Sequence, residues 1–104
     1  MSFQATSTDI TLDSDHHTLR AKCVKSDGRT TQDSTLDLDT CIGNINGDFQ
    51  WGKKDYSLTA KNVALDGDEL SADLTKEDGT TIRTGAVIHL GDRIENDNGT
   101  LKFT

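Results

Sequence analysis

Residues 41–51 read CIGNINGDFQW, and residues 93–103 read RIENDNGTLKF. Both stretches place Asn-x-Asn-Gly after an isoleucine and end on an aromatic residue, Trp51 in the first and Phe103 in the second. Asn-Gly readily accepts the positive φ angles of a two-residue β-hairpin turn. The two phrases therefore predict two hairpins at matched positions of a repeat of about fifty residues.

The repeat extends outward from these phrases through the whole chain. Phe3 aligns with Tyr56, and after a two-residue deletion TLRAKCVKSDG (18–28) aligns with ELSADLTKEDG (69–79). A one-residue insertion in the second copy then restores the alignment up to its last aromatic residue. The chain is thus two similar copies in tandem.

Apolar residues recur with a period of two in each copy, which is typical of strands with one buried face. Leu19, Ala21 and Cys23 alternate with charged residues, and residues 70–74 follow the same pattern. Leu36 and Leu38 of the first copy, like Ile88 and Leu90 of the second, are expected to repeat the alternation. This pattern predicts an all-β protein.

Two further turn signals and two short helices complete the predicted elements. Asp27-Gly28 and Asp78-Gly79 favour positive φ and predict two more tight hairpin turns. One-turn helices fit the phrases DLDTCIGN (37–44) and HLGDRIEN (89–96).

Length and charge restrict the class of protein. The chain has 104 residues, which is one domain's worth, and a formal net charge of −7 with its lysines and arginines scattered singly. Nucleic acid is therefore not an expected partner. The start of the chain has no apolar signal region, and no run approaches the roughly 20 apolar residues of a membrane helix.

The cysteines do not predict a metal site. Cys23 and Cys41 are the only two, and a structural zinc site needs about four ligands. Cys23 stands where the second copy has Leu74, so we expect a small buried hydrophobe. A disulfide between Cys23 and Cys41 stays open as an alternative.

With the repeat, the phrase LDLDTCIGNINGDFQW (36–51) and the closing HLGDRIENDNGTLKF (89–103), the chain resembles the cyanovirin-N homolog family of lectins over essentially its whole length. The resemblance implies two pseudo-symmetric tandem repeats, each a triple-stranded sheet plus a β-hairpin, with strands exchanged between the halves. Pseudo-domain A would combine about residues 1–39 with 92–104, and pseudo-domain B would span about 40–91. Strand exchange makes the chain one cooperative unit.

The resemblance also implies a function. The family binds terminal α(1→2)-linked mannose of high-mannose glycans, without metal, cofactor or catalysis, in one pocket at the far end of each domain. Carried over by position, the first pocket, site A, consists of Ala5, Thr6, Val24, Lys25, Ser26, Asn96, Asp97 and Asn98. The second pocket, site B, consists of Asn44, Ile45, Asn46, Lys54, Asp55, Thr59, Thr75, Lys76 and Glu77. Such residues on turns offer donors and acceptors side by side to sugar hydroxyls.

Several positions depart from the pattern of a well-studied family member. In site A that relative has a glutamine where this chain has Ala5 and a glutamate where it has Val24. Around site B it has glutamates in place of Gly43 and Leu58 and an arginine in place of Glu77. Each lost hydrogen bond is worth roughly 0.5–1.5 kcal/mol. We therefore expect weaker binding than in that relative, with one or both sites functional.

The family's disulfides are missing. Cys23 occupies one half-cystine position, but its partner position holds Ser7, and Ala60 and Leu74 replace the second pair. Neither family bridge can form. Together with the missing signal region this favours the cytoplasm, with unconventional export as the alternative.

Expected partners are oligomannose glycans or glycoproteins. The segment between the copies, WGKKDY (51–56), contains no proline, and we expect a monomer. A domain-swapped dimer is the alternative, because strand-exchanged folds can exchange whole halves.

Two other classes of protein fit parts of the sequence. The acidic runs LDSDHH (12–17) and LDGDELSAD (65–73) could mark a calcium-binding β module, but neither has EF-hand spacing, so solvated turns are favoured. The departures from the family pattern leave open an interaction protein that has kept the fold and lost sugar binding.

Neither an enzyme nor a histidine metal site is expected. Asp37 and Asp39 share one face of a predicted strand, which is better explained by surface solubility than by paired catalysis. His16 and His17 are adjacent, and on a strand their rings would point to opposite faces.

Overall fold

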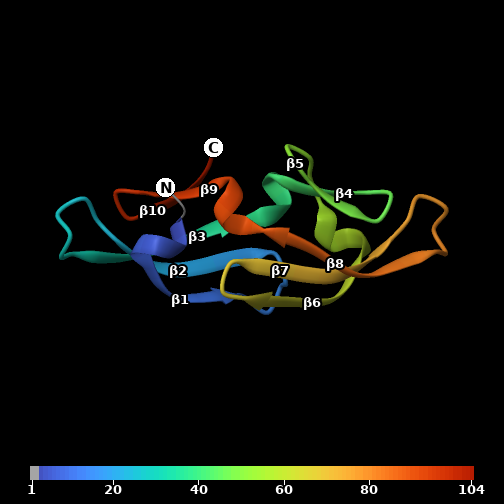
Figure 1. Ribbon diagram of the computed structural model, residues 1–104, viewed down its shortest axis with the longest axis horizontal. Helices are drawn as coiled ribbons and strands as arrows, with labels where there is room; N and C mark the ends of the chain where they lie inside the picture. Colours follow the sequence, from blue (N-terminus) through green and yellow to red (C-terminus); the bar gives the residue numbers. More distant parts are fainter. Residues whose placement is uncertain (1–2) are drawn as a thin grey trace.

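Two three-stranded antiparallel sheets form most of the protein (Figure 1). The computed structural model describes residues 3–104, which extend over 49 × 22 × 17 Å. The first sheet has the order β1 (Ser7–Leu12), β2 (Thr18–Val24), β3 (Thr31–Asp37). The second has the order β6 (Ala60–Asp66), β7 (Glu69–Thr75), β8 (Ile82–His89). The sheets lie end to end along the long axis, so the predicted all-β fold is confirmed.

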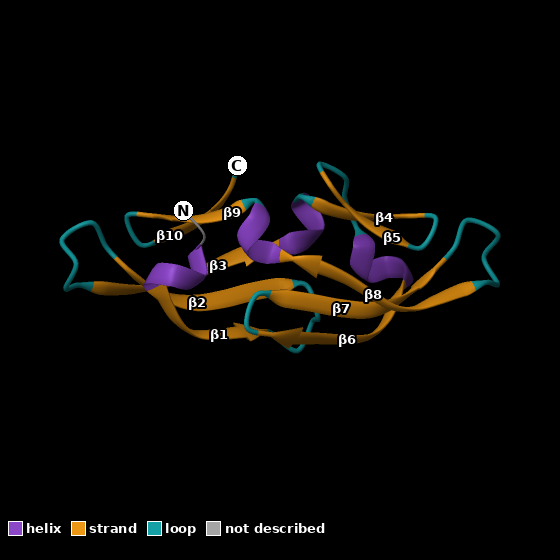
Figure 2. Cartoon of the chain, in the orientation of Figure 1, coloured by secondary structure: helices purple, strands orange, loops and turns teal. Residues whose placement is uncertain are grey.

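Within residues 3–104, two hairpins and four 3₁₀ helices complete the fold (Figure 2). The hairpins are β4 (Ile42–Ile45) with β5 (Asp48–Trp51), and β9 (Ile94–Asp97) with β10 (Thr100–Phe103). The helices are η1 (Phe3–Thr6), η2 (Leu38–Thr40), η3 (Tyr56–Thr59) and η4 (Leu90–Asp92). The two phrases predicted to form one-turn helices, residues 37–44 and 89–96, contain η2 and η4. Helices η1 and η3 were not predicted. No helix in residues 3–104 has the length and apolar character needed to cross a membrane.

The chain crosses the centre of the molecule twice (Figure 1). It leaves β3 through η2 into β4, and it returns from β8 through η4 into β9. Strand β5 contacts β8, and β10 contacts β3, so the hairpin of each copy packs on the sheet of the other. The pseudo-domain boundaries near residues 39 and 92 stay a prediction, and residues 1 and 2 lie outside the described part.

Most of the buried apolar residues form one cluster that draws on both copies. The predicted alternation is confirmed in β2 and β7, where the side chains of Leu19, Ala21 and Cys23 and their equivalents at 70–74 are at most 2% exposed. Leu38 and Leu90 are also buried, but the prediction that they continue a strand is wrong. They open η2 and η4, because the chain must leave the sheet there to cross over.

The four predicted turns fall into two types. Asn46-Gly47 and Asn98-Gly99 have positive φ at both residues and close two-residue hairpins, as predicted. At Asp27-Gly28 and Asp78-Gly79 the prediction of a tight turn is wrong, since only the glycine has positive φ and the loops are wider. There the aspartate instead accepts hydrogen bonds from backbone N–H groups two and three residues ahead.

The two copies differ where the alignment needed gaps. The extra residue of the second copy makes a bulge in β8 at Gly85, whose φ is 70°. The two extra residues of the first copy lengthen the loop between β1 and β2, residues 13–17. This loop carries His16 and His17, so their placement on a strand was wrong.

Candidate functional site

Site A is organised around Asn96, at the end of β9. Its Nδ2 donates hydrogen bonds to Thr6 Oγ1 at 2.9 Å and to the Val24 carbonyl at 2.8 Å. Its Oδ1 accepts from the Gly99 N–H at 2.7 Å. One amide therefore joins the hairpin β9–β10, the end of η1 and the end of β2.

Site B repeats this arrangement at the other end of the molecule (Figure 1). Asn44 Nδ2 donates to Thr59 Oγ1 and to the Thr75 carbonyl, both at 2.8 Å. Asn44 Oδ1 accepts from the Gly47 N–H at 2.8 Å. Because these hydrogen bonds engage both hydrogens of the amide, we interpret Asn44 and Asn96 as positioning residues.

A second asparagine in each turn has free donors. Asn98 Oδ1 accepts from the Ser26 N–H at 2.9 Å, and Asn46 Oδ1 accepts from the Glu77 N–H at 3.2 Å. Within residues 3–104 the NH₂ group of neither side chain has a hydrogen-bond partner. These two amides are held by their oxygen while their hydrogens face outward to a ligand or to water.

The lysines of both sites lie against the hairpin turns. A Cβ added at Gly99 would lie 3.0 Å from Lys25 Cγ, and one added at Gly47 would lie 3.2 Å from Lys76 Cγ. The glycines thus let each turn pack on the lysine's methylene stem while its ammonium group stays at the surface.

The loops that carry these lysines are braced from within. Hydrogen bonds from the Thr30 hydroxyl and from the Arg29 and Thr30 N–H groups lower the pKa of Asp27 to about 2. The Thr81 hydroxyl and nearby N–H groups do the same to the pKa of Asp78. A carboxylate at each loop tip thereby restrains the segment next to the site.

The remaining predicted residues lie next to the two asparagine centres. Ala5 precedes Thr6 in η1, and Asp97 lies between the two turn asparagines of site A. In site B, Ile45 is 41% exposed, and a β-bridge between Gly43 and Asp55 brings Lys54 and Asp55 beside β4. The structure thus gathers the predicted residues at two places, and their role in sugar binding stays a prediction.

Gly43 lies under the segment that follows β5. A Cβ built on it would lie 2.5 Å from Lys53 Cβ and 3.0 Å from both the N and the O of Lys54. No larger side chain fits there without displacing residues 53–55. The departure from the family pattern at Gly43 is therefore a change in how the backbone packs as well as a lost carboxylate. Leu58, another departure, is 79% exposed beside site B.

Two hollows of the surface lie away from site A and site B. A cavity of about 560 Å³ is lined by Asp15, His16, Ser57 and residues 60–63, and a second of about 370 Å³ by parts of β1, β6 and the loop between β1 and β2. None of the predicted sugar-binding residues lines either one. Both are open to solvent, and neither belongs to site A or site B.

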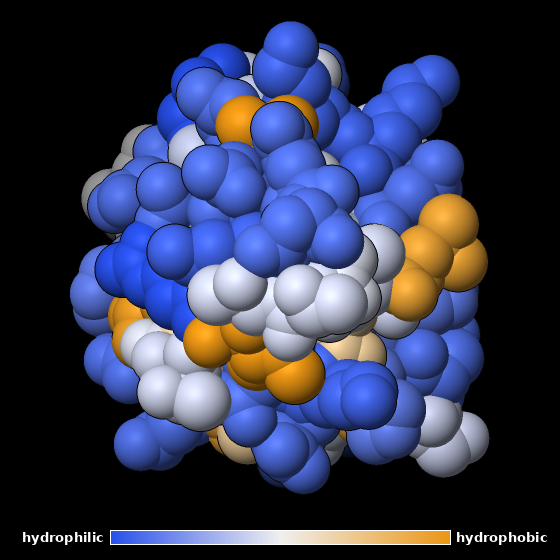
Figure 3. Space-filling model, turned by 90° about the vertical axis from the view of Figure 1, so that its right-hand side faces the viewer, coloured by the Kyte–Doolittle hydropathy of each residue, from blue (hydrophilic) through white to orange (hydrophobic). Residues whose placement is uncertain are grey.

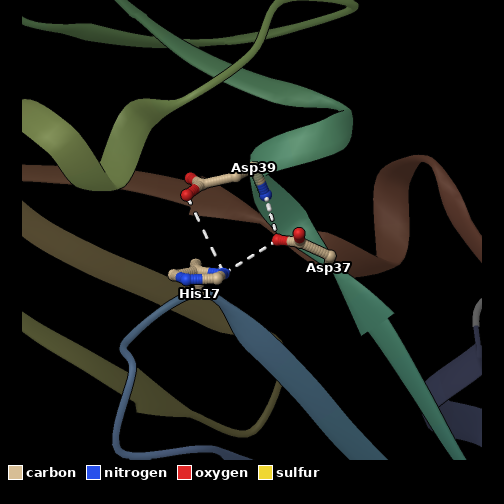
Figure 4. Close-up of side chains that lie close together, drawn as sticks. All are labelled: His17, Asp37 and Asp39. Carbon is tan, nitrogen blue, oxygen red and sulfur yellow. Dashed lines mark hydrogen bonds and ion pairs between the residues drawn. The ribbon is translucent and has the colours of Figure 1, made fainter.

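A cluster that the sequence analysis missed lies where the loop between β1 and β2 meets the junction of β3 with η2 (Figure 4). His17 Nδ1 lies 2.8 Å from Asp37 Oδ1 and 3.8 Å from Asp39 Oδ2. Burial alone lowers the pKa of His17, but the hydrogen bond to Asp37 and the negative charges of Asp39 and Asp15 outweigh it and raise the pKa above its ordinary value. The only signal in the sequence was the two-residue insertion in the loop that carries His17, although His17 itself aligns with Asp68.

The prediction that Asp37 and Asp39 lie on one strand face is wrong. Asp37 ends β3 and caps η2, where its Oδ1 accepts from the Asp39 N–H at 3.0 Å. Asp39 lies inside η2 and accepts a hydrogen bond from the Ser57 N–H at 3.1 Å. Both carboxylates thus have structural partners.

Both cysteines are buried and free. Ser7 and Cys23 are cross-strand partners, and the Ser7 hydroxyl donates to Cys23 Sγ at 3.4 Å. Ala60 and Leu74 are cross-strand partners in the second sheet. Burial raises the pKa of Cys41 to about 11, which keeps the thiol protonated and unreactive.

Comparison with known proteins gives a consistent family. The CVNH domain model matches residues 3–102. The cyanovirin-N homolog of Tuber borchii is 38% identical over 106 residues, which cover 99% of each chain. The solved structure of the T. borchii protein has a TM-score of 0.86 at 39% identity and covers all of both chains.

Two further solved structures are similar. A designed cyanovirin-N homolog lectin, LKAMG, has a TM-score of 0.91 at 35% identity and covers all of both chains. Microvirin, solved in complex with mannobiose, has a TM-score of 0.83 at 28% identity and covers 99% of this chain and 98% of its own.

Proposed function

The chain belongs to the cyanovirin-N homolog (CVNH) family, and we propose that it is a lectin for terminal α(1→2)-linked mannose of high-mannose glycans. Binding of mannobiose by microvirin supports this ligand class. The observation that carries the proposal is the pair of equivalent sites, each with an outward-facing asparagine NH₂ group on a braced turn.

The proposed mechanism is hydrogen bonding without chemistry. In site A the Asn98 NH₂ group and the hydroxyls of Thr6 and Ser26 can donate to adjacent sugar hydroxyls, and the Asp97 carboxylate can accept from them. In site B the Asn46 NH₂ group corresponds to that of Asn98, and the Thr59 hydroxyl to that of Thr6, so both can donate to sugar hydroxyls in the same way. Because Asn44 and Asn96 hold these elements together, the sites are organised before the ligand arrives, which lowers the entropic cost of binding.

We propose weak binding at each site. Ala5 and Val24 bring no hydrogen-bonding side chain to site A, and around site B the same is true of Gly43 and Leu58. Each missing hydrogen bond removes roughly 0.5–1.5 kcal/mol. Two weak sites on one chain can still gain avidity on a branched glycan that reaches both.

We propose that sugar binding needs no metal. The aspartates of the first acidic run are engaged by protein donors: Asp13 pairs with Arg20 at 2.9 Å, and Asp15 accepts from the Thr18 N–H at 2.9 Å. Within residues 3–104, no group of three clustered metal-binding side chains lies at site A or site B. These contacts favour solvated turns over a calcium-binding module.

Two further properties are proposed from the sequence. A cytoplasmic location is proposed from the lack of the family's cysteine pairs, and a monomer from the flexible, proline-free segment at 51–56. Gel filtration with light scattering distinguishes the monomer from a domain-swapped dimer.

The test is a titration of ¹⁵N-labelled protein with α(1→2)-mannobiose, with and without a chelator, followed by amide chemical shifts. We expect shifts at residues 44–46, at residues 96–98, or at both, unchanged by the chelator. Chelator-sensitive shifts would favour the calcium alternative. No shift anywhere would refute the lectin and favour the interaction protein.

Two matched variants assign the sites. Asn98→Asp and Asn46→Asp keep the oxygen that accepts the loop N–H and remove the outward-facing NH₂ group. We expect each to abolish shifts at its own site and to leave the other site unchanged, so each serves as the control for the other. Unchanged binding in both would show that these amides do not contact sugar.

A further inference from the structure

His17, Asp37 and Asp39 bring three metal-binding atoms together from two parts of the chain, the loop between β1 and β2 and the junction of β3 with η2. His17 comes from the loop between β1 and β2, Asp37 from the end of β3 and Asp39 from η2. The ring Nδ1 and one oxygen of each carboxylate all lie within 4.8 Å of one another (Figure 4). We propose that these three side chains bind a divalent transition-metal ion of the zinc class, at a site separate from both sugar sites.

The spacing is close to what such an ion requires. Ligand bonds of about 2.0–2.2 Å in tetrahedral geometry place the ligand atoms about 3.3 Å from one another. The distance from His17 Nδ1 to Asp37 Oδ1 is 2.8 Å and that to Asp39 Oδ2 is 3.8 Å. The oxygens of Asp37 and Asp39 lie within 4.8 Å of each other. Binding would therefore widen the shortest contact by about 0.5 Å and shorten the others by about 0.5–1.5 Å, which side-chain rotations can supply.

The three ligands are held by other parts of the protein. The Ser57 hydroxyl and N–H both donate to Asp39, and the Asp39 N–H donates to Asp37. Asp15 Oδ2 lies 3.7 Å from His17 Nε2, on the far side of the ring from the other two carboxylates. A carboxylate near the second ring nitrogen is the usual orienting partner of a metal-bound histidine, because it favours the tautomer whose other nitrogen binds the ion.

The donor set selects the class of ion. Calcium takes six to eight oxygen ligands, and this cluster offers one nitrogen and two carboxylates. Imidazole with carboxylates suits zinc and similar ions, which accept three protein ligands and complete their shell with water. The side chains of His17 and Asp37 are 28% and 47% exposed, so ion and water can reach the site.

The second copy provides an internal comparison. Leu38 N–H bonds to the His17 carbonyl, and Leu90 N–H bonds to the Asp68 carbonyl, so Asp68 takes the place of His17. By the same alignment His89 replaces Asp37, and Gly91 replaces Asp39. The second copy therefore has only two possible metal ligands at this place, Asp68 and His89, with Asp68 Oδ1 3.6 Å from His89 Nδ1. The proposed site therefore depends on Asp39, whose position in the second copy is a glycine.

The site links the two copies. Asp39 is bonded to Ser57 in η3, and Tyr56 of the same helix donates to the His16 carbonyl at 2.7 Å. An ion bound here would tie the loop between β1 and β2 to η2 and, through Ser57, to the second copy. Its expected effect is a more stable fold, with sugar affinity unchanged.

The test uses the untagged full chain and the metals themselves. Isothermal titration with Zn²⁺ is expected to show one site, and Co²⁺ to give the visible absorption of a low-symmetry nitrogen–oxygen site. A hundredfold excess of Zn²⁺ over its Kd is expected to raise Tm by at least about 5 °C. Ca²⁺ is expected to give neither heat nor a Tm shift.

Variants decide the assignment. His17→Gln and Asp39→Asn are expected to weaken Zn²⁺ binding at least tenfold, and His89→Gln, the matched control in the second copy, to leave it unchanged. Amide spectra establish that each variant is folded, and Asp37→Asn replaces any that is not. Failure of Zn²⁺ to bind the parent protein would overturn the proposal, as would equal binding in the parent and the ligand variants. Neither result would affect the mannobiose titration, so the two proposals fail separately.

Discussion

At the scale of single residues, Gly43 shows how one position can act through backbone packing. It is buried in β4, and residues 53–55 pass directly over it. Its place in the sequence suggested only a missing glutamate. The contacts indicate that the glycine allows Lys54 and Asp55 to approach β4, where they form part of site B.

Gly43→Ala is expected to destabilise the protein by roughly 1–3 kcal/mol, since the new Cβ would overlap Lys53 Cβ and force the segment away. Urea unfolding measures the change. Amide shifts confined to residues 43–59 would locate the displacement. Unchanged stability would show that the segment moves aside without cost.

Ser7 and Cys23 retain the geometry of a lost bridge. They are cross-strand partners, and their side-chain oxygen and sulfur are 3.4 Å apart. Ser7→Cys is expected to form a disulfide with Cys23 in air and to raise stability by about 3 kcal/mol, because the bridge restricts the unfolded chain. Thiol titration and unfolding with and without reductant check this, and Cys41 stays the single free thiol if the pairing is correct.

At the scale of elements, each site is an arrangement of a turn, a short helix and a strand end that one asparagine holds together. Asn96→Ala removes the hydrogen bonds that the amide donates to Thr6 and Val24 and the one that it accepts from Gly99, and it leaves the Gly99 N–H and the Val24 carbonyl without that partner. We expect a loss of about 1–3 kcal/mol in stability together with the loss of sugar binding at site A.

The contrast with Asn98→Asp separates positioning from contact. That variant is expected to lose binding at site A while keeping nearly the parent stability, since its oxygen still accepts the Ser26 N–H. Equal destabilisation of the two variants would contradict this division of roles. Thermal unfolding and mannobiose titration of the same samples provide both measurements.

The loops at 25–30 and 76–81 make stability depend on pH. In the folded protein the pKa values of Asp27 and Asp78 are lowered from 3.8 to about 2 by hydroxyl and N–H donors. A lowered pKa in the folded state stabilises above the unfolded pKa, and the contribution is lost as pH falls through the folded value. Stability is therefore expected to fall between about pH 4 and pH 2.

Thermal unfolding across this range tests the loops. The double variant Asp27→Asn, Asp78→Asn is expected to show a shallower decline below pH 4, because an asparagine oxygen keeps the N–H bonds without a titrating group. Asp33→Asn, in the middle of β3, removes a charge without those bonds and serves as the control. An unchanged slope in the double variant would show that other groups govern acid unfolding.

At the scale of the whole molecule, the two copies share one core. The main cluster includes Phe3 and Leu19 from the first copy and Tyr56 and Leu70 from the second. Near the pseudo-symmetry axis, Trp51 stacks on its own equivalent, Phe103, with ring centroids 5.6 Å apart and planes inclined by 13°. Figure 3 shows one end of the molecule, where the surface is largely hydrophilic with separate hydrophobic spots.

Fragments 1–52 and 53–104 are each expected to be unfolded. The hairpins β4–β5 and β9–β10 each pack on the sheet of the other copy. Either half alone would therefore expose one face of its sheet and lose much of its apolar burial. Circular dichroism and amide dispersion of the separate fragments test this. A cooperative unfolding transition in either fragment would contradict a shared core.

The sequence by itself determined the repeat, the strands with one buried face and the two Asn-Gly turns. These features depend on residues adjacent in the chain, through the period of two and through the φ angles that Asn and Gly accept. The local sequence did not predict that Leu38 and Leu90 leave their strands and open η2 and η4. The crossover at these points depends on contacts with the other copy.

Only the tertiary structure decided which side chains meet. Asn96 bonds to Thr6, 90 positions earlier, and His17 meets Asp37 across 20 positions, without a pattern in the intervening sequence. Such contacts depend on where the crossovers place whole elements. Local pattern therefore specifies the strands and turns of this protein, and packing between the copies specifies its sites.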